Sequence, residues 1–127
     1  MGWHPDVPQT NPLHMKVQIY VGDVSEDGGA FGYVPRSHRP DAGPYSGVHR
    51  LEDMPGHKVF PGKAGTAILF NSYGWHTSMI NRTPTPRKSI ILIYEKWNEE
   101  KFNPEKFDAI SDRLTTPERR QLFSLER

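Results

Sequence analysis

The sequence predicts a mainly β protein, of the sandwich or barrel kind, on three observations. Short runs rich in β-branched and aromatic residues recur from the N-terminus to about residue 95. Clusters drawn from the 11 glycines and 12 prolines separate these runs, as turns separate strands. A helical spacing of apolar residues begins only after about residue 100. We therefore expect a single domain over residues 1–127, with strands to about 95 and a helical tail over about 100–127.

The first expected strand, 15–21 (MKVQIYV), alternates between two kinds of side chain that fall on opposite faces. The apolar set is Val17, Ile19 and Val21, and the other set is Lys16, Gln18 and Tyr20. Two such faces ordinarily mean that the apolar face packs in the core and the other face meets solvent. The alternative is that the second face carries functional residues. Five further segments have strand composition: 30–34 (AFGYV), 57–60 (HKVF), 66–71 (TAILFN), 75–80 (WHTSMI) and 88–95 (KSIILIYE).

The C-terminal part changes to a helical period. Asn103-Pro104 has the pattern of a helix cap followed by proline at the first helical position, and Thr116-Pro117 repeats it. The apolar positions expected to pack are Phe107, Ile110 and Leu114 in the first helix, and Leu122 and Phe123 in the second. We expect both helices to pack against the outside of the sheets.

Composition excludes several classes of function. The chain has no cysteine, so disulfides, thiolate metal sites and cysteine nucleophiles are excluded, and a reducing cytoplasm is the expected compartment. The formal net charge of +1, with interspersed acids and bases, argues against nucleic acid and anionic membrane surfaces as partners. No apolar run approaches the roughly 20 residues of a membrane span. A small-molecule substrate is the expected partner, and a homo-oligomer is left open.

The metal donors available to this chain are imidazole and oxygen ligands. His4 and Asp6 are two residues apart, so both side chains face one point if the backbone is extended. That spacing alone is a weak signal, because six histidines make an accidental His-x-Asp common. His76 is the best third ligand, because it follows a strand and a turn-like Ser-Tyr-Gly, a position at the mouth of a barrel.

Arg87 follows His76 by eleven residues, and on an adjacent antiparallel strand it would present its guanidinium to a carboxylate beside the histidine. Two histidines and one carboxylate on one face of an iron leave three open positions, as in non-haem Fe(II) oxygenases. A 2-oxo acid would take two of these positions and O2 the third. Arg87 would then anchor the far carboxylate of 2-oxoglutarate, with Ser78 adding a hydroxyl.

Three stretches, in this order, resemble the phytanoyl-CoA dioxygenase family of Fe(II)/2-oxoglutarate enzymes. They are WHPD (3–6), GDVSEDGGAFGYVPRSHR (22–39) and GTAILFNSYGWHTSMINRTPTPRKSIILIY (65–94). The most specific part is GGAFGYVPRSHR, since a turn, a strand and a Pro-x-Ser-His corner have no general reason to recur together. The resemblance spans nearly the whole chain and extends to the closing LTTPERRQLF, which is similar to the family's last helix.

The resemblance implies a double-stranded β-helix, which is a cupin-like jelly roll. It implies hydroxylation of an unactivated C–H bond of a small molecule, with succinate and CO2 as co-products. Asp6 favours hydroxylation over halogenation, because a small residue there would leave room for a halide. The implied iron ligands are His4, Asp6 and His76, and the implied cosubstrate residues are Arg87 and Ser78. Gln18 is a further cosubstrate candidate, because it lies on the face of the first strand that would point into the cavity. Tyr20 and His49 are the expected substrate contacts.

Two departures from the family pattern matter. Arg36 stands where the family generally has glycine, so a positive φ at this corner would be strained. The helices and opening strand that usually precede the His-x-Asp are missing, and a jelly roll needs about two more strands than the six expected. We therefore expect an incomplete jelly roll, either the C-terminal part of a longer product or one completed by a partner.

Two other functions stay open. One is a truncated, catalytically inactive relative, and His4 and Asp6 near the fraying end of the chain predict weak iron binding. The other is a cupin-like metal protein that does not use 2-oxoglutarate. Arg87 discriminates between this protein and the oxygenase, because only the oxygenase needs Arg87 for 2-oxoglutarate. The identity of the substrate stays open in both cases.

Overall fold

A computed structural model describes residues 2–9, 13–96 and 103–125. The chain divides into two compact units, Met1–Glu95 and Lys96–Arg127, and each is described by itself. The division separates the expected strands from the expected helical tail. The single domain, and the packing of the helices on the outside of the sheets, stay predictions. Among the described residues, no helix has the length and apolar character needed to cross a membrane.

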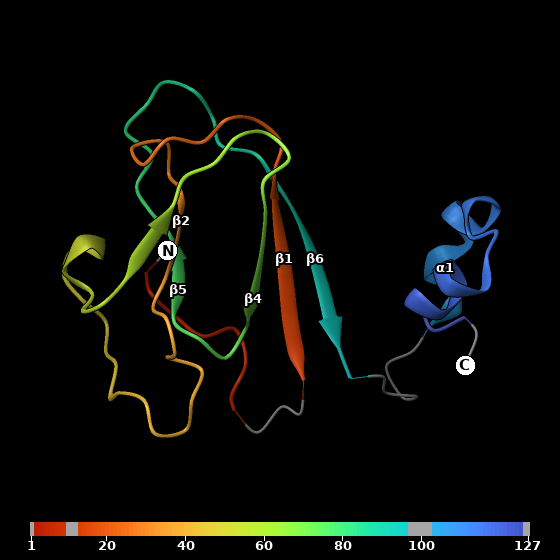
Figure 1. The fold of residues 1–127 in the computed structure, drawn as a ribbon, viewed down its shortest axis with the longest axis horizontal. Helices are drawn as coiled ribbons and strands as arrows, with labels where there is room; N and C mark the ends of the chain where they lie inside the picture. The colour runs from red at the N-terminus through yellow and green to blue at the C-terminus, as the bar shows by residue number, and fades with distance from the viewer. Residues whose placement is uncertain (1, 10–12, 97–102, 126–127) are drawn as a thin grey trace. The chain divides into compact units, whose positions relative to one another are not determined.

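Six strands form two antiparallel sheets in the first unit (Figure 1). One sheet has the order β4-β1-β6, and the other has the order β3-β2-β5. This architecture confirms the mainly β jelly-roll class and all six expected strands. The strands are β1 (His14–Tyr20), β2 (Phe31–Tyr33), β3 (Lys58–Phe60), β4 (Ala67–Asn71), β5 (His76–Ser78) and β6 (Ser89–Glu95).

The main core lies between the two sheets. Phe31 of β2 and Phe70 of β4 meet with ring centroids 4.6 Å apart, and Tyr20 of β1 is buried with them. The hydroxyl of Tyr20 donates to the carbonyl of Phe60 at 2.8 Å and accepts from the N–H of Phe31 at 2.8 Å. These two bonds satisfy a polar group that would otherwise be costly to bury.

The faces of β1 are the reverse of the ordinary core-against-solvent expectation. Gln18 and Tyr20, on the polar face, are buried, whereas Val21 on the apolar face is exposed. The polar face is therefore the one that points into the space between the sheets, which is the alternative that the sequence left open. His14 is buried on this same face.

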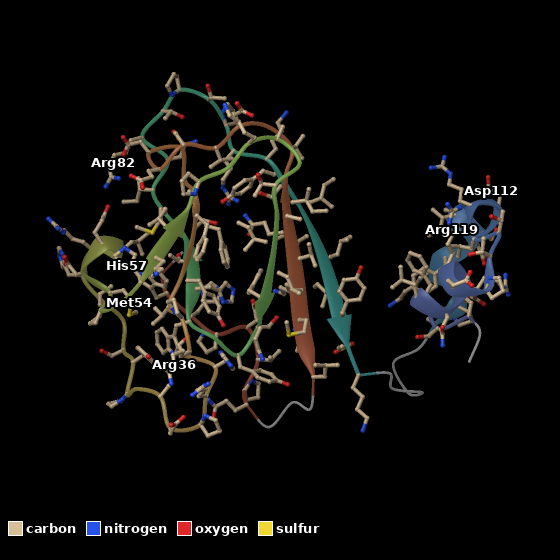
Figure 2. The ribbon with its side chains drawn as sticks, viewed as in Figure 1. Arg36, Met54, His57, Arg82, Asp112 and Arg119 are labelled. Atoms are coloured by element: carbon tan, nitrogen blue, oxygen red, sulfur yellow. The ribbon has the colours of Figure 1, made fainter. Side chains whose placement is uncertain are left out.

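A second apolar cluster covers the outer face of the β3-β2-β5 sheet. It is built from Trp3, Val34, Met54 and Met79. Gly32 permits this packing, because a Cβ there would lie 3.0 Å from the Trp3 ring. The Trp3 indole N–H donates to the carbonyl of Leu51 at 2.8 Å, in the 3₁₀ turn η1 (Leu51–Asp53). Figure 2 shows Met54 and His57 on the side of β2 that faces away from β1.

In the second unit, Pro104–Arg113 is a 3₁₀ helix (η3) and Pro117–Leu122 is an α-helix (α1). The expected caps are confirmed: the side chain of Asn103 accepts from the N–H of Glu105, and that of Thr116 accepts from the N–H of Arg119. The expected apolar face is also present, with Leu114 buried and the rings of Phe107 and Phe123 5.1 Å apart. Leu122 is exposed, contrary to expectation.

Candidate metal centre

The N-terminal segment is held along β5 by backbone hydrogen bonds. The N–H of His4 donates to the carbonyl of His76 at 3.1 Å, and the N–H of His76 donates to the carbonyl of His4 at 3.0 Å. The N–H of Asp6 donates to the carbonyl of Ser72 at 2.9 Å. This pairing is antiparallel and places the His-x-Asp pair directly beside the third candidate ligand.

The three expected metal ligands meet at one place. One donor atom from each of His4, Asp6 and His76 lies within 4.8 Å of the others. His76 Nε2 lies 3.0 Å from Asp6 Oδ2, and His4 Nε2 lies 3.9 Å from Asp6 Oδ1. The imidazole centroids are 4.8 Å apart. Two imidazoles and one carboxylate on one side of a point form the donor set of a facial triad.

Hydrogen bonds fix which ring nitrogen of each histidine faces the carboxylate. Nδ1 of His4 lies 2.8 Å from the carbonyl oxygen of Gly2, and Nδ1 of His76 lies 2.8 Å from that of Gly74. Because a carbonyl oxygen only accepts, each Nδ1 carries the hydrogen, and in a neutral imidazole Nε2 offers its lone pair. Such backbone contacts are typical of metal-binding histidines.

Burial in particular lowers the pKa of His76, outweighing the Gly74 hydrogen bond and the Asp6 charge, which raise it. The ring is packed between aromatic side chains, with its centroid 4.9 Å from that of Phe70 and 5.8 Å from that of Phe31. A neutral His76 lone pair therefore faces a carboxylate oxygen at 3.0 Å. This convergence of electron-pair donors fits a bound cation.

Lys16 joins this cluster, although the sequence did not single it out as a site residue. Its Nζ lies 2.8 Å from Asp6 Oδ2, the same oxygen that faces His76. Its side chain is only 15% exposed. The alternation of β1 places Lys16 on the same face as Gln18, and that spacing was the available signal for its inward direction.

Arg87 and Ser78, the expected cosubstrate residues, are in contact. Arg87 Nη2 donates to Ser78 Oγ at 2.6 Å, and Arg87 Nη1 donates to Ser89 Oγ at 2.8 Å. Gln18 Nε2 donates to the same Ser89 hydroxyl at 3.2 Å. Among the ion pairs of the described residues, none involves Arg87, so its guanidinium is a part-buried cation whose partners are hydroxyls. An anion would complete this site.

The two expected substrate contacts differ in burial. Tyr20 is fully buried in the core, where its hydroxyl is used by two backbone groups, and its expected substrate role stays a prediction. His49 is exposed in the irregular segment before η1 and lies outside the donor cluster of the described residues.

A cavity of about 390 Å³ is lined mainly by residues of β2 and β4 and the chain after β2, and none of the three candidate metal ligands forms part of its wall. Phe31 and Phe70, which pack against His76, form part of this wall, together with Arg36 and His38 from the chain after β2. Arg36 has φ 69°, so the strain expected from a non-glycine residue at this corner is present. Figure 2 shows where Arg36 lies.

Comparison with protein families gives a match over most of the first unit. The model for Phytanoyl-CoA dioxygenase (PhyH) matches residues 1–89. An ectoine dioxygenase of Nocardia farcinica is 27% identical over 114 residues, which cover 72% of this chain and 38% of that protein. An ectoine dioxygenase of Bordetella bronchiseptica is 25% identical over 130 residues, and the match covers 83% of this chain and 41% of that protein. The chain thus spans about two fifths of the length of these relatives.

Solved structures give the same architecture. The crystal structure of SnoN, a non-heme alpha ketoglutarate dependent epimerase from nogalamycin biosynthesis, has a TM-score of 0.52 and 26% identity over 65% of this chain and 34% of that one. SnoN in complex with Fe³⁺, alpha ketoglutarate and nogalamycin RO has a TM-score of 0.53 and 22% identity, and the match covers 75% of this chain and 41% of the SnoN chain. At 22% identity, the match to the SnoN complex shows a similar fold only.

Proposed function

The chain belongs to the phytanoyl-CoA dioxygenase family, and from this premise we propose that it carries the metal and cosubstrate sites of an Fe(II)/2-oxoglutarate-dependent dioxygenase. The observation that carries the proposal is the convergence of His4, Asp6 and His76, with both histidines fixed through Nδ1. These three residues would hold Fe(II). The donor set fits this ion, since two imidazoles and one carboxylate leave positions open for exchangeable ligands.

Arg87, Ser78 and Gln18 would hold 2-oxoglutarate. The Arg87 guanidinium is held by two hydroxyls and supplies the positive charge for the distal carboxylate. Ser78 lies two residues beyond His76 on β5 and so points to the same side of the sheet. The strand separates the metal end of the site from the carboxylate end by about 7 Å, at roughly 3.4 Å per residue.

Bound iron and 2-oxoglutarate would supply the oxidising chemistry, in which O2 is consumed and 2-oxoglutarate becomes succinate and CO2. The residues of this chain bind, orient and shield. The carbonyls of Gly2 and Gly74 orient the imidazoles, and Phe31 and Phe70 keep water from the buried side of His76. We propose hydroxylation of a small molecule as the outcome.

Epimerisation is a second candidate, because the 26% identical structural neighbour is an alpha ketoglutarate dependent epimerase. The two outcomes differ in the fate of oxygen, since hydroxylation adds an oxygen atom to the substrate and epimerisation adds none. Mass spectrometry after reaction under labelled O2 separates them once a substrate is in hand.

The test is an anaerobic titration of the chain with Fe(II) and 2-oxoglutarate, followed by a succinate assay after O2 is admitted. We expect binding of both and slow succinate formation above that of His76→Ala. Binding without succinate would identify an inactive relative. Fe(II) binding with a 2-oxoglutarate affinity unaffected by Arg87→Leu would instead support the cupin-like metal protein.

A further inference from the structure

Lys16 is a largely buried cation, with its side chain 15% exposed, and its neighbours on the adjacent strands are apolar. By register it lies beside Phe70 of β4 and Ile93 of β6, both on the face that points between the sheets. Among the ion pairs of the described residues, its one partner is the Asp6 carboxylate at 2.8 Å. That oxygen is also the one 3.0 Å from His76 Nε2. The charge of Lys16 is therefore balanced by a residue that the proposed function assigns to the metal.

Loading the site changes this balance, and this step rests on the proposed function. A divalent ion and the doubly charged 2-oxoglutarate are neutralised by each other, and Asp6 and Arg87 carry opposite single charges. Lys16 then remains as one uncompensated positive charge next to the metal. An unpaired charge is costly on a side chain that, like that of Lys16, is only 15% exposed.

We propose that Lys16 is the recognition residue for a substrate carboxylate that lies beside the metal. The substrate class is then a small organic acid with a single negative charge near the C–H bond that reacts. The approach is open on the β6 side, because Ile91 and Ile93, on the same face as Gln18 and Lys16, are 53% and 57% exposed. Lys16 both attracts the anion and fixes its distance from the metal.

The test uses the 127-residue chain loaded with Mn(II), a redox-inactive stand-in for Fe(II), and 2-oxoglutarate. The probes are 3-phenylpropionate and its neutral amide, 3-phenylpropionamide, and the readout is manganese-induced relaxation of their protons. We expect the acid to bind at least about tenfold more tightly than the amide, as a charge-assisted hydrogen bond implies. Lys16→Met should remove this preference, and Lys16→Arg, which keeps the charge, should retain it.

Lys63→Met is the matched control, because it removes the same charge from an exposed residue paired with Asp23. It should leave the preference unchanged. An equal preference in the wild type and Lys16→Met, or no acid preference in the wild type, overturns the proposal. A loss of 2-oxoglutarate affinity in Lys16→Met as large as that in Arg87→Leu also overturns it, by assigning Lys16 to the cosubstrate. Failure of the wild type to bind Mn(II) or 2-oxoglutarate would instead refute the proposed function.

Discussion

Ser89 links two residues of the proposed cosubstrate site. Its hydroxyl oxygen accepts from Arg87 Nη1 at 2.8 Å and from Gln18 Nε2 at 3.2 Å, while Ser78 holds the other terminal nitrogen of the guanidinium. Arginine has many rotamers, so ordering it on binding would cost free energy. The two serines reduce that cost, because they hold the guanidinium in place before an anion arrives.

Substitutions of Arg87 and Ser89 should weaken 2-oxoglutarate binding by different amounts. Arg87→Leu removes the charge and should weaken 2-oxoglutarate binding by about 1.5–3 kcal/mol, roughly 10- to 100-fold. Ser89→Ala removes a hydroxyl that accepts from Arg87 and Gln18 but leaves the Arg87 charge in place, so it should cost only about 0.5–1.5 kcal/mol. Calorimetric titration of the Mn(II)-loaded chain measures both. Equal losses in the two variants would show that Arg87 does not contact the cosubstrate.

Some residues of the site could be predicted from the sequence, and others could not. His4, Asp6 and Ser78 follow from i, i+2 spacing and the family resemblance, and the structure brings them together with His76 and Arg87. Ser89 depends on the register of β1 against β6, which pairs it with Tyr20. A slip of one residue would turn it outward, and short-range sequence patterns do not determine that register.

At the scale of elements, the turn between β4 and β5 positions His76. The N–H of Gly74 donates to the carbonyl of Asn71 at 3.1 Å, and its own carbonyl accepts from His76 Nδ1 at 2.8 Å. A Cβ at Gly74 would overlap the hydroxyl and ring of Tyr33, which is in turn bonded to the carbonyl of Asn71. The close approach of Tyr33 therefore requires glycine here.

Gly74→Ala should lower the free energy of unfolding by about 1–3 kcal/mol, because Tyr33 or the turn must shift. It should also weaken Mn(II) binding, since the carbonyl that orients His76 moves with the turn. Chemical denaturation and manganese titration measure the two effects. Gly47→Ala is the matched control, because a Cβ there meets no atom within 4 Å. Similar losses in both variants would contradict this account.

The elements also show where sequence patterns mislead. The six strands could be predicted because strand composition and the intervening turns are local properties. The inward face of β1 could not, because the largely buried Lys16 and the buried Gln18 are held by contacts with residues outside the strand, Asp6 and Ser89. η3 is a 3₁₀ helix although its cap and apolar spacing also suit an α-helix.

At the scale of the whole first unit, the β4-β1-β6 sheet presents an apolar outer face. Val17 is paired with Leu69 on one side and Leu92 on the other, so the three side chains form a row across this face. Leu69 and Leu92 are both exposed. Within the described residues, β6 is bonded on one side only, so an unpaired edge adjoins the apolar face. Such surfaces promote association.

The 127-residue chain should therefore associate with itself as its concentration rises. Replacing Leu69 and Leu92 together with glutamate should shift sedimentation equilibrium toward the monomer by roughly tenfold or more, because truncating central apolar contacts commonly costs 1 kcal/mol or more each. Leu122→Glu is the control, since it places one such charge on an exposed leucine of the second unit. A monomeric wild type at every concentration would contradict this prediction. So would an equal shift in the control, because the apolar row would then not be the surface through which the chains meet.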